Sequence, residues 1–167
     1  ALSREMVDEI IAALTTFAQQ RVRAVILRAA PHSAVWSAGH DVHELPLSGR
    51  DPLGWDDPLR YLIREIENFS ATVSAMIEGS VWGDACETVF ACDLIIAAPG
   101  ATFAITPARL GVPYNIAGML TFLNGSNMRI AKEMAFTAKP VSASRAARLA
   151  TINHVVPADE IEAFCRT

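Results

Sequence analysis

The residues best suited to chemistry lie in the stretch EGSVWGDACE, which ends at Glu87. Gly79 and Gly83 let the backbone turn sharply and come close to a ligand. A helix that begins near Asp84 leaves its first N–H groups without partners, and such groups stabilise an oxygen that gains negative charge during a reaction. Glu87, one turn further on, adds a carboxylate to the same region. The pattern also fits a glycine turn before an acidic first helical turn with no chemical role, so both interpretations stay open.

The segments around this stretch predict how it is positioned. Thr72 to Ile77 is a short β-rich apolar run, the two glycines break it, and Leu94 to Ala98 is a second strand-like run after a helix-like segment. We therefore expect a strand, a tight turn between Gly79 and Gly83, a helix and a second strand.

A second stretch, VWSAGHDVHEL, covers Val35 to Leu45 and follows the apolar run Val22 to Leu27. It lies within a connection, Ala30 to Gly54, that has no sustained period, holds three glycines and three prolines and is longer than most loops. These features favour a functional loop around a site. His40 is the residue of interest in it, although a lone histidine is more often a surface or core-edge residue.

Together the two stretches resemble the crotonase (enoyl-CoA hydratase/isomerase) superfamily, whose members carry S/A-A-G-x-D-x-x-E-L and, downstream, E-G-x-x-x-G-G-x-x-E. The resemblance continues through DLIIAA and TPARLGVPYN and covers nearly the whole chain. It implies an α/β fold, the superfamily's spiral of ββα turns, in a single domain over residues 1–167. Ala1-Leu2-Ser3 resembles an element that follows the first hairpin of crotonases, whose chains also continue past the position of Thr167, so we expect truncation at both ends.

The resemblance assigns roles to residues of both stretches. The backbone N–H groups of His40 and Asp84 would form an oxyanion hole for a thioester oxygen. Gly39 and Gly83 would lie beside it and contact the substrate. The carbonyl of Ala38 would receive the adenine amine of coenzyme A.

Positions further along the chain bear on the reaction. Hydratases of this superfamily use two glutamates, one at the position of Glu87 and one where this sequence has Pro107. Because adding water to a double bond needs an acid and a base on both sides of the reacting atoms, a single carboxylate argues against hydration. Thr106 and Tyr114 match residues near the departing carboxylate in the superfamily's decarboxylases. Asp41 would cap a short helix. Asp41 and Pro107 are also predicted to contact the substrate, as are Ala38, Gly39 and Gly83.

We therefore expect decarboxylation of a malonyl-type CoA thioester, such as methylmalonyl-CoA to propionyl-CoA. Loss of carbon dioxide leaves an enolate whose charge sits on the thioester oxygen, where two N–H donors stabilise it. Two alternatives remain open. One is other enolate chemistry, by an isomerase, hydratase or thioesterase, and the other is a catalytically impaired acyl-CoA-binding or assembly-forming relative.

Asp84 departs from the superfamily pattern, which has Gly-Gly where this chain has Gly83-Asp84. A carboxylate about 5 Å from a developing enolate, at an effective dielectric constant of about 20, would repel it by roughly 3 kcal/mol, on the order of a hundredfold in rate. The side chain could instead turn outward. Asp84 also lies three residues before Glu87 on one helical face, so we expect the two carboxyls to titrate together, with one pKa raised.

The composition excludes several classes of protein. With 51% hydrophobic and 19% charged residues, the 167-residue chain forms one globular domain with a core. A net charge of −4 without a basic cluster, and no long apolar run, argue against nucleic-acid and membrane partners. The odd set Cys86, Cys92 and Cys165 has no metal-ligand spacing and indicates reduced, cytoplasmic thiols. No metal or organic cofactor is expected, since coenzyme A is part of the substrate, and the resemblance implies a homotrimer or hexamer at full length.

Capping and periodicity predict the remaining elements. A helix capped by Ser3 would bury one face, made of Met6, Val7, Ile10, Ile11, Leu14 and Phe17. VRAVILRA, residues 22–29, reads as a strand. A helix starting at Asp57-Pro58 would bury Leu59, Leu62, Ile63, Ile66 and Phe69. Then follow a strand at Thr102 to Ile105, an irregular segment to Asn115, and helices at Asn127 to Phe136 and Ser142 to Leu149.

Overall fold

The computed structural model describes residues 1–31, 33–44 and 54–167, and the side chain of Val42 is not described. Two four-stranded sheets form its centre, with strand orders β1-β3-β5-β8 and β2-β4-β6-β7. The strands are β1 (Ala24–Arg28), β2 (Val35–Ser37), β3 (Thr72–Ile77), β4 (Ser80–Trp82), β5 (Leu94–Ala97), β6 (Thr102–Ala104), β7 (Val141–Ser142) and β8 (His154–Val155). All neighbours pair in parallel except β6 and β7, which are antiparallel.

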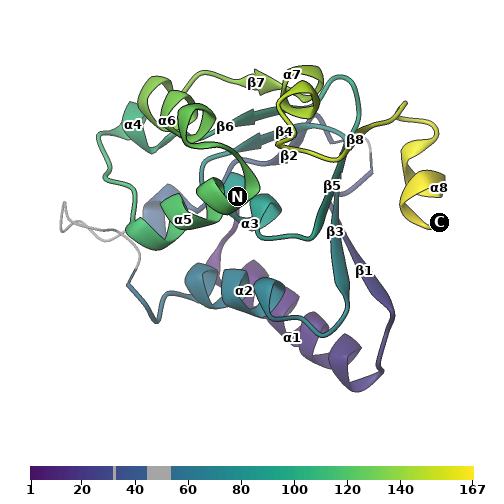
Figure 1. The fold of residues 1–167 in the computed structure, drawn as a ribbon. Coiled ribbons are helices and arrows are strands. Elements are labelled where there is room, and N and C mark those ends of the chain that lie inside the picture. Colours follow the sequence, from purple (N-terminus) through teal and green to yellow (C-terminus); the bar gives the residue numbers. More distant parts are fainter. Residues whose placement is uncertain (32, 45–53) are drawn as a thin grey trace.

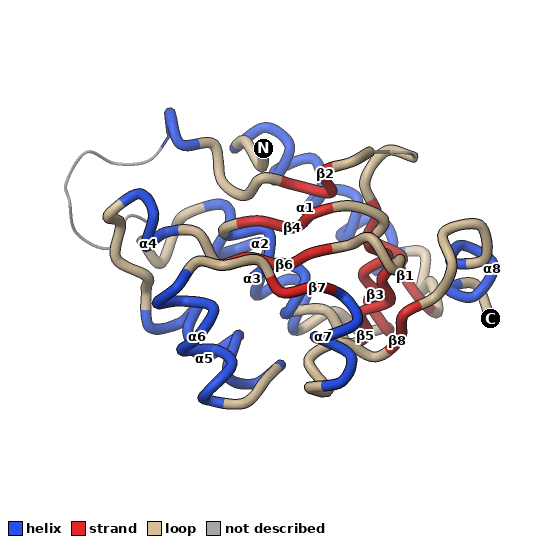
Figure 2. Tube along the Cα trace, turned by 90° about the horizontal axis from the view of Figure 1, so that it is seen from above, coloured by secondary structure: helices blue, strands red, loops and turns tan. Residues whose placement is uncertain are grey.

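Helices follow or cover the strands. They are α1 (Arg4–Gln19), α2 (Pro58–Glu67), α3 (Asp84–Phe90), α4 (Pro107–Leu110), α5 (Ile116–Gly125), α6 (Met128–Thr137), α7 (Ala143–Arg148) and α8 (Ile161–Cys165), with a 3-10 turn at Val42–Glu44. Figure 1 shows α1 and α2 side by side below α3 and α5, and Figure 2 shows the second sheet from above with α5 and α6 on one flank.

The chain winds as a spiral, and each turn supplies one strand to each sheet. β1, β2 and α2 form one turn, β3, β4 and α3 the next, and β5, β6 and α4 a third. Equivalent strands of successive turns therefore become parallel neighbours, with Ala24 beside Thr72 and Ser74 beside Leu94. The predicted α/β spiral of ββα turns is confirmed. The corners between the second strand and the helix of each turn lie close together.

Two elements correct the sequence predictions. The segment between Gly79 and Gly83 is not only a turn, because it contains strand β4, whose Val81 pairs with Ser37 and Phe103. A strand this short is stabilised by its partners in the sheet rather than by a local pattern. The irregular segment after β6 begins with a one-turn helix, α4, which has Pro107 at its first position and ends at Gly111 in the left-handed conformation.

The first helix is confirmed, but its buried face is narrower than expected. Ser3 caps α1 by accepting a hydrogen bond from the Met6 N–H at 3.3 Å. Of the apolar positions, Val7 and Leu14 are buried, whereas Met6 and Phe17 remain 46% and 37% exposed. The described part of the chain covers that side of α1 only in part.

The other capped helices agree with the sequence. Asp57 caps α2 with Pro58 at its first position, and Leu59, Leu62, Ile63 and Ile66 are buried while Phe69 is partly so. Asn127 caps α6 and Ser142 caps α7 through their side-chain oxygens. The helix α5, capped by Asn115, was not delimited by the sequence pattern.

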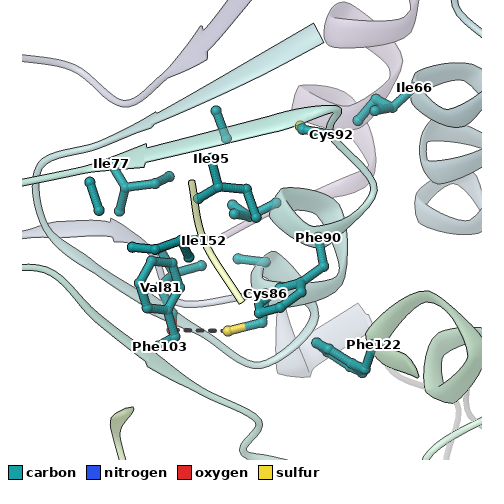
Figure 3. Close-up of a cluster of buried hydrophobic side chains, with 14 of the residues drawn as sticks. Ile66, Ile77, Val81, Cys86, Phe90, Cys92, Ile95, Phe103, Phe122 and Ile152 are labelled. Atoms are coloured by element: carbon teal, nitrogen blue, oxygen red, sulfur yellow. Dashed lines mark hydrogen bonds between the residues drawn. The ribbon is translucent and has the colours of Figure 1, made fainter. Parts of the chain in front are cut away.

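The main core lies between α3 and the two sheets, where Phe90 meets Phe103 and Phe122 edge to face (Figure 3). Cys86 sits in this core, and its thiol donates to Val81 O at 3.2 Å. Burial raises the pKa of Cys86 to about 12, so the group is an uncharged thiol. The buried face of α3 thus fixes the helix rigidly, and its first residue, Asp84, is held with it.

Candidate active site

Gly39 brings the second predicted stretch against the first. Its φ of +93° lies in the region that favours glycine, and an added Cβ would lie 2.8 Å from Trp82 O and 2.9 Å from Asp84 N. No other residue fits there without displacing backbone. The residues that follow Gly39 and Gly83, His40 and Asp84, therefore lie at one place, as expected from the sequence.

The backbone at His40 is fixed by the start of the chain. Leu2 N donates to Gly39 O at 2.7 Å, and Asp41 N donates to Leu2 O at 3.2 Å, which makes a parallel bridge between Leu2 and His40. In such a bridge the N–H of the central residue points to the opposite side. The N–H of His40 is thus directed away from Leu2.

Gly83 brings a third corner to the same place. It has φ +59°, and its N–H donates to Ala104 O at 2.8 Å. An added Cβ would lie 3.1 Å from Thr106 Oγ1 and 3.4 Å from Ala38 O. The predicted residues Ala38, Gly83 and Thr106 are therefore neighbours, although they are far apart in the sequence.

The His40 ring is held beside a carboxylate that the sequence did not assign to the site. Its side chain is 9% exposed, its Nδ1 pairs with Asp41 O at 3.0 Å, and its Nε2 lies 3.9 Å from Asp57 Oδ2. The Asp57 carboxylate raises the pKa of His40 despite the opposing effect of burial. Burial also raises the pKa of Asp57, but His40 and the Leu59 N–H, 2.9 Å from Asp57 Oδ1, outweigh it and lower that pKa.

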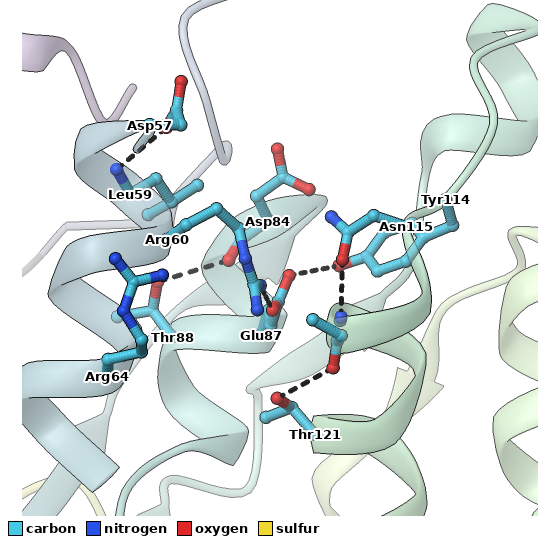
Figure 4. Close-up of polar contacts among 12 residues, drawn as sticks. Asp57, Leu59, Arg60, Arg64, Asp84, Glu87, Thr88, Tyr114, Asn115 and Thr121 are labelled. Carbon is cyan, nitrogen blue, oxygen red and sulfur yellow. Dashed lines mark hydrogen bonds and ion pairs between the residues drawn. The ribbon is translucent and has the colours of Figure 1, made fainter. Parts of the chain in front are cut away.

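Glu87 is fully buried and is engaged by two partners (Figure 4). Arg60 of α2 forms an ion pair with Glu87 Oε1, and the Tyr114 hydroxyl donates to Glu87 Oε2 at 3.1 Å. Gly118 makes room for this cluster, because an added Cβ would lie 2.6 Å from Glu87 Oε2 and would also collide with the Tyr114 ring. Glu87 therefore links α2, α3 and α5.

Asp84 is half-buried, and the charged groups around it differ from those expected. Burial raises the pKa of Asp84, and the Asp57 carboxylate adds to this, whereas His40, Arg60 and Tyr114 oppose it. The pKa of Asp84 is raised, as expected for one of the two carboxyls, but the cause differs from the prediction: burial contributes most, and the carboxylate that adds to it is Asp57 rather than Glu87. Burial and the Asp84 carboxylate raise the pKa of Tyr114 well above its usual range.

The remaining predicted residues lie around this cluster. Asp41 begins the 3-10 turn, with its Oδ1 accepting from His43 N at 3.0 Å, as the cap prediction requires. Pro107 and Tyr114 line an apolar cavity of about 320 Å³ with Met119 and Phe136. Leu45, the last residue of the motif on the second stretch, lies outside the described residues.

Three features of the cluster were not predicted from the sequence: Arg60, Gly118 and the pairing of Asp57 with His40. Arg60 carried a usable signal, since it lies between Leu59 and Ile63 on the buried side of α2, where a cation requires a carboxylate partner. No sequence signal marks Gly118, because its role depends on a contact between helices.

Comparison with known proteins gives the cluster a context. The sequence profile of the enoyl-CoA hydratase/isomerase family matches residues 1–166. The chain belongs to this family. It is 48% identical to methylmalonyl-CoA decarboxylase of Escherichia coli (strain K12) over 164 residues, which are 98% of this chain and 63% of that protein.

Solved structures of the enoyl-CoA hydratase/isomerase family agree. A methylmalonyl-CoA decarboxylase in complex with 2-nitronate-propionyl-CoA has a TM-score of 0.93 and 46% identity, covering 96% of this chain and 62% of its own. An enoyl-CoA hydratase of Mycobacterium smegmatis has a TM-score of 0.87 and 27% identity, covering 99% and 65%. The chain thus spans less than two thirds of the length of each of these proteins.

Within residues 1–31, 33–44 and 54–167, no group of three or more His, Cys, Asp or Glu side chains is arranged to hold a metal ion. In the same ranges, no helix has the length and apolar character needed to cross a membrane.

Proposed function

We propose that this chain carries the active site of an enzyme that removes carbon dioxide from a malonyl-type CoA thioester, converting methylmalonyl-CoA to propionyl-CoA. The observation that carries the proposal is the state of the carboxylates. Glu87 is committed to Arg60 and Tyr114, and Pro107 stands at the second glutamate position of hydratases. Hydration would need an acid and a base free to act on the substrate.

The proposed reaction needs mainly donors for a developing enolate. The thioester oxygen would accept hydrogen bonds from the N–H groups of His40 and Asp84, which Gly39 allows to lie close together. As the bond to the carboxylate breaks, its electron pair moves toward the thioester, and the charge gathers on that oxygen. Donors fixed in place before the reaction stabilise this charge without reorganising.

Thr106 and Tyr114 would hold the departing carboxylate out of the enolate plane. The Thr106 hydroxyl lies beside Gly83, and Tyr114 lies against Glu87. The raised pKa of Tyr114 keeps its hydroxyl protonated, so it does not repel an anion. Its one proton, which Glu87 Oε2 accepts in this structure, would turn to the departing carboxylate when the substrate is bound. Similarity to methylmalonyl-CoA decarboxylase supports this choice of substrate.

A second candidate is an acyl-CoA-binding relative with little activity, and the carboxyl of Asp84 beside the proposed oxyanion hole favours it. Release of carbon dioxide from methylmalonyl-CoA separates the two. The enzyme converts the thioester, whereas a binding protein retains it unchanged, as calorimetry would detect. The protein should be tested with whatever sequence naturally flanks this chain. Absence of both turnover and CoA-thioester binding at millimolar ligand would refute both candidates.

A further inference from the structure

Asp84 supplies the candidate site with a second functional group besides its backbone N–H. Figure 4 shows its carboxyl extending from the start of α3, away from Glu87. The residue is partly exposed, so its carboxyl can exchange protons with water, and its backbone N–H lies against Gly39 of the candidate site. The groups that interact with it electrostatically are His40, Asp57, Arg60 and Tyr114. Figure 4 shows Asp57 and Arg60 on one side of Asp84 and Tyr114 on the other. A carboxyl placed there can act on the acyl group whose oxygen the same residue would bind.

We infer that Asp84 is the proton donor that completes the reaction, delivering its proton to the α-carbon of the enolate. This rests on the proposed decarboxylation. The bond between the α-carbon and the carboxylate breaks, carbon dioxide leaves, and the electron pair stays in the enolate. The Asp84 O–H bond then breaks, a C–H bond forms at the α-carbon, and Asp84 is left as a carboxylate. Water returns a proton to it before the next turnover.

The neighbouring polar groups have other roles. The Tyr114 hydroxyl donates to Glu87 Oε2, interacts with Asp84 and would hold the departing carboxylate, and its raised pKa makes it a weak acid. The Glu87 carboxylate is paired with Arg60. The His40 ring contacts Asp41 O through Nδ1, and its Nε2 lies beside the Asp57 carboxylate. Asp84 is therefore the acid in the cluster best able to turn to the substrate. Burial raises its pKa, which increases the protonated fraction at a given pH.

The test is the stereochemistry of protonation. Methylmalonyl-CoA is converted in D₂O by the wild-type protein and by the Asp84→Gly and Asp84→Asn variants. The enantiomers of the deuterated propionyl group are then measured by NMR of a chiral derivative. Asp159→Asn, at an exposed carboxylate on the surface, is the matched control. Circular dichroism establishes that each variant is folded.

A positioned acid accelerates proton transfer by about 10²–10⁴-fold, so the wild type and Asp159→Asn should deliver deuterium to one face in large excess. Both Asp84 variants should lower that excess about tenfold or more while still releasing carbon dioxide. In the wild type, the excess should also fall as the pH rises through the pKa of Asp84, because the donor is lost.

Three results would contradict the inference. An unchanged enantiomer excess in Asp84→Asn or Asp84→Gly removes Asp84 as the donor and leaves the proposed decarboxylation intact. A wild-type excess that is absent, or that stays constant with pH, has the same consequence without any variant. Failure of the wild type to release carbon dioxide overturns the proposed function itself.

Discussion

The single residue Asp84 would affect an enolate in two opposite ways. Its backbone N–H would stabilise the enolate, and its carboxylate would repel it by roughly 3 kcal/mol at about 5 Å. Since burial raises the pKa of Asp84, this repulsion depends on pH. Below that pKa the carboxyl is neutral and the repulsion vanishes, and above it the repulsion is complete.

Replacing Asp84 by Gly should therefore speed the release of carbon dioxide from methylmalonyl-CoA, by up to about a hundredfold above the pKa of Asp84. The gain should shrink as the solution is acidified, and Asp84→Asn should recover part of it, because Asn keeps the shape and removes the charge. The rate of carbon dioxide release is measured against pH for the three proteins. A slower or unchanged rate in Asp84→Gly at high pH would show that the repulsion argument is wrong.

The pairing of Asp57 with His40 predicts a shift that NMR can follow. Asp57→Asn removes the carboxylate that holds the pKa of His40 up, yet Asn can still cap α2. The pKa of His40 should fall in a titration of its ring signals, while Asp56→Asn, at the exposed neighbouring residue, should leave it in place. If both variants titrate like the wild type, the 3.9 Å contact has no electrostatic role.

The same pair predicts how stability depends on pH. The contribution of His40, whose pKa is raised, is lost as the pH rises through that pKa. The contribution of Asp57, whose pKa is lowered, is lost as the pH falls through that pKa. Asp57→Asn should thus lose most stability relative to the wild type in the window between the two values.

Three helices meet at the Arg60–Glu87–Tyr114 cluster. Arg60 lies on α2, Glu87 lies on α3, and Tyr114 lies just before α5. Replacing Arg60 by Leu leaves the fully buried Glu87 carboxylate without its ion-pair partner, and such losses cost about 3–5 kcal/mol in the free energy of unfolding. Replacing Glu87 by Leu as well should recover most of that loss. Urea unfolding of both variants, with Arg148→Leu on the surface as control, measures these differences. A double variant no more stable than Arg60→Leu would count against the pair as the source of the cost.

The approach of α5 to Glu87 predicts the effect of one added methyl group. Gly118→Ala places a Cβ against Glu87 Oε2 and the Tyr114 ring, so it should destabilise the protein even though Ala favours a helix by about 1 kcal/mol over Gly. Gly100→Ala is the control, since nothing lies within 4 Å of its added Cβ. Equal thermal stability of the two variants would show that α5 can move away from Glu87 at little cost.

Elements with a local signal were predictable from the sequence. Caps at Ser3, Asp57, Asn127 and Ser142 mark the starts of their helices, because each side-chain oxygen satisfies a free N–H of the helix. Strand β4 has no such signal, since its three residues are a strand only through β2 and β6. The exposed positions on α1 show a further limit, because an apolar stripe does not say what covers it.

The parts of the site that could be predicted are those where the backbone conformation requires one residue type. Gly39 and Gly83 have positive φ, and a Cβ at Gly39 would collide with the backbone, so the motif itself marks where the two loops meet. The pairing of Glu87 with Arg60 and Tyr114 was not predictable, because Arg60 lies on α2 and Tyr114 in the segment before α5, both far from Glu87 in the sequence. Their engagement decides the proposed chemistry, since it takes away the carboxylate that hydration would use.

The most direct test compares methylmalonyl-CoA and crotonyl-CoA side by side with the protein in its natural flanking sequence. We expect release of carbon dioxide from methylmalonyl-CoA to be faster than addition of water to crotonyl-CoA. We also expect Tyr114→Phe to slow the decarboxylation, because the hydroxyl that would hold the leaving carboxylate is lost. Hydration at a comparable or greater rate, or an unchanged rate in Tyr114→Phe, would contradict the proposed function.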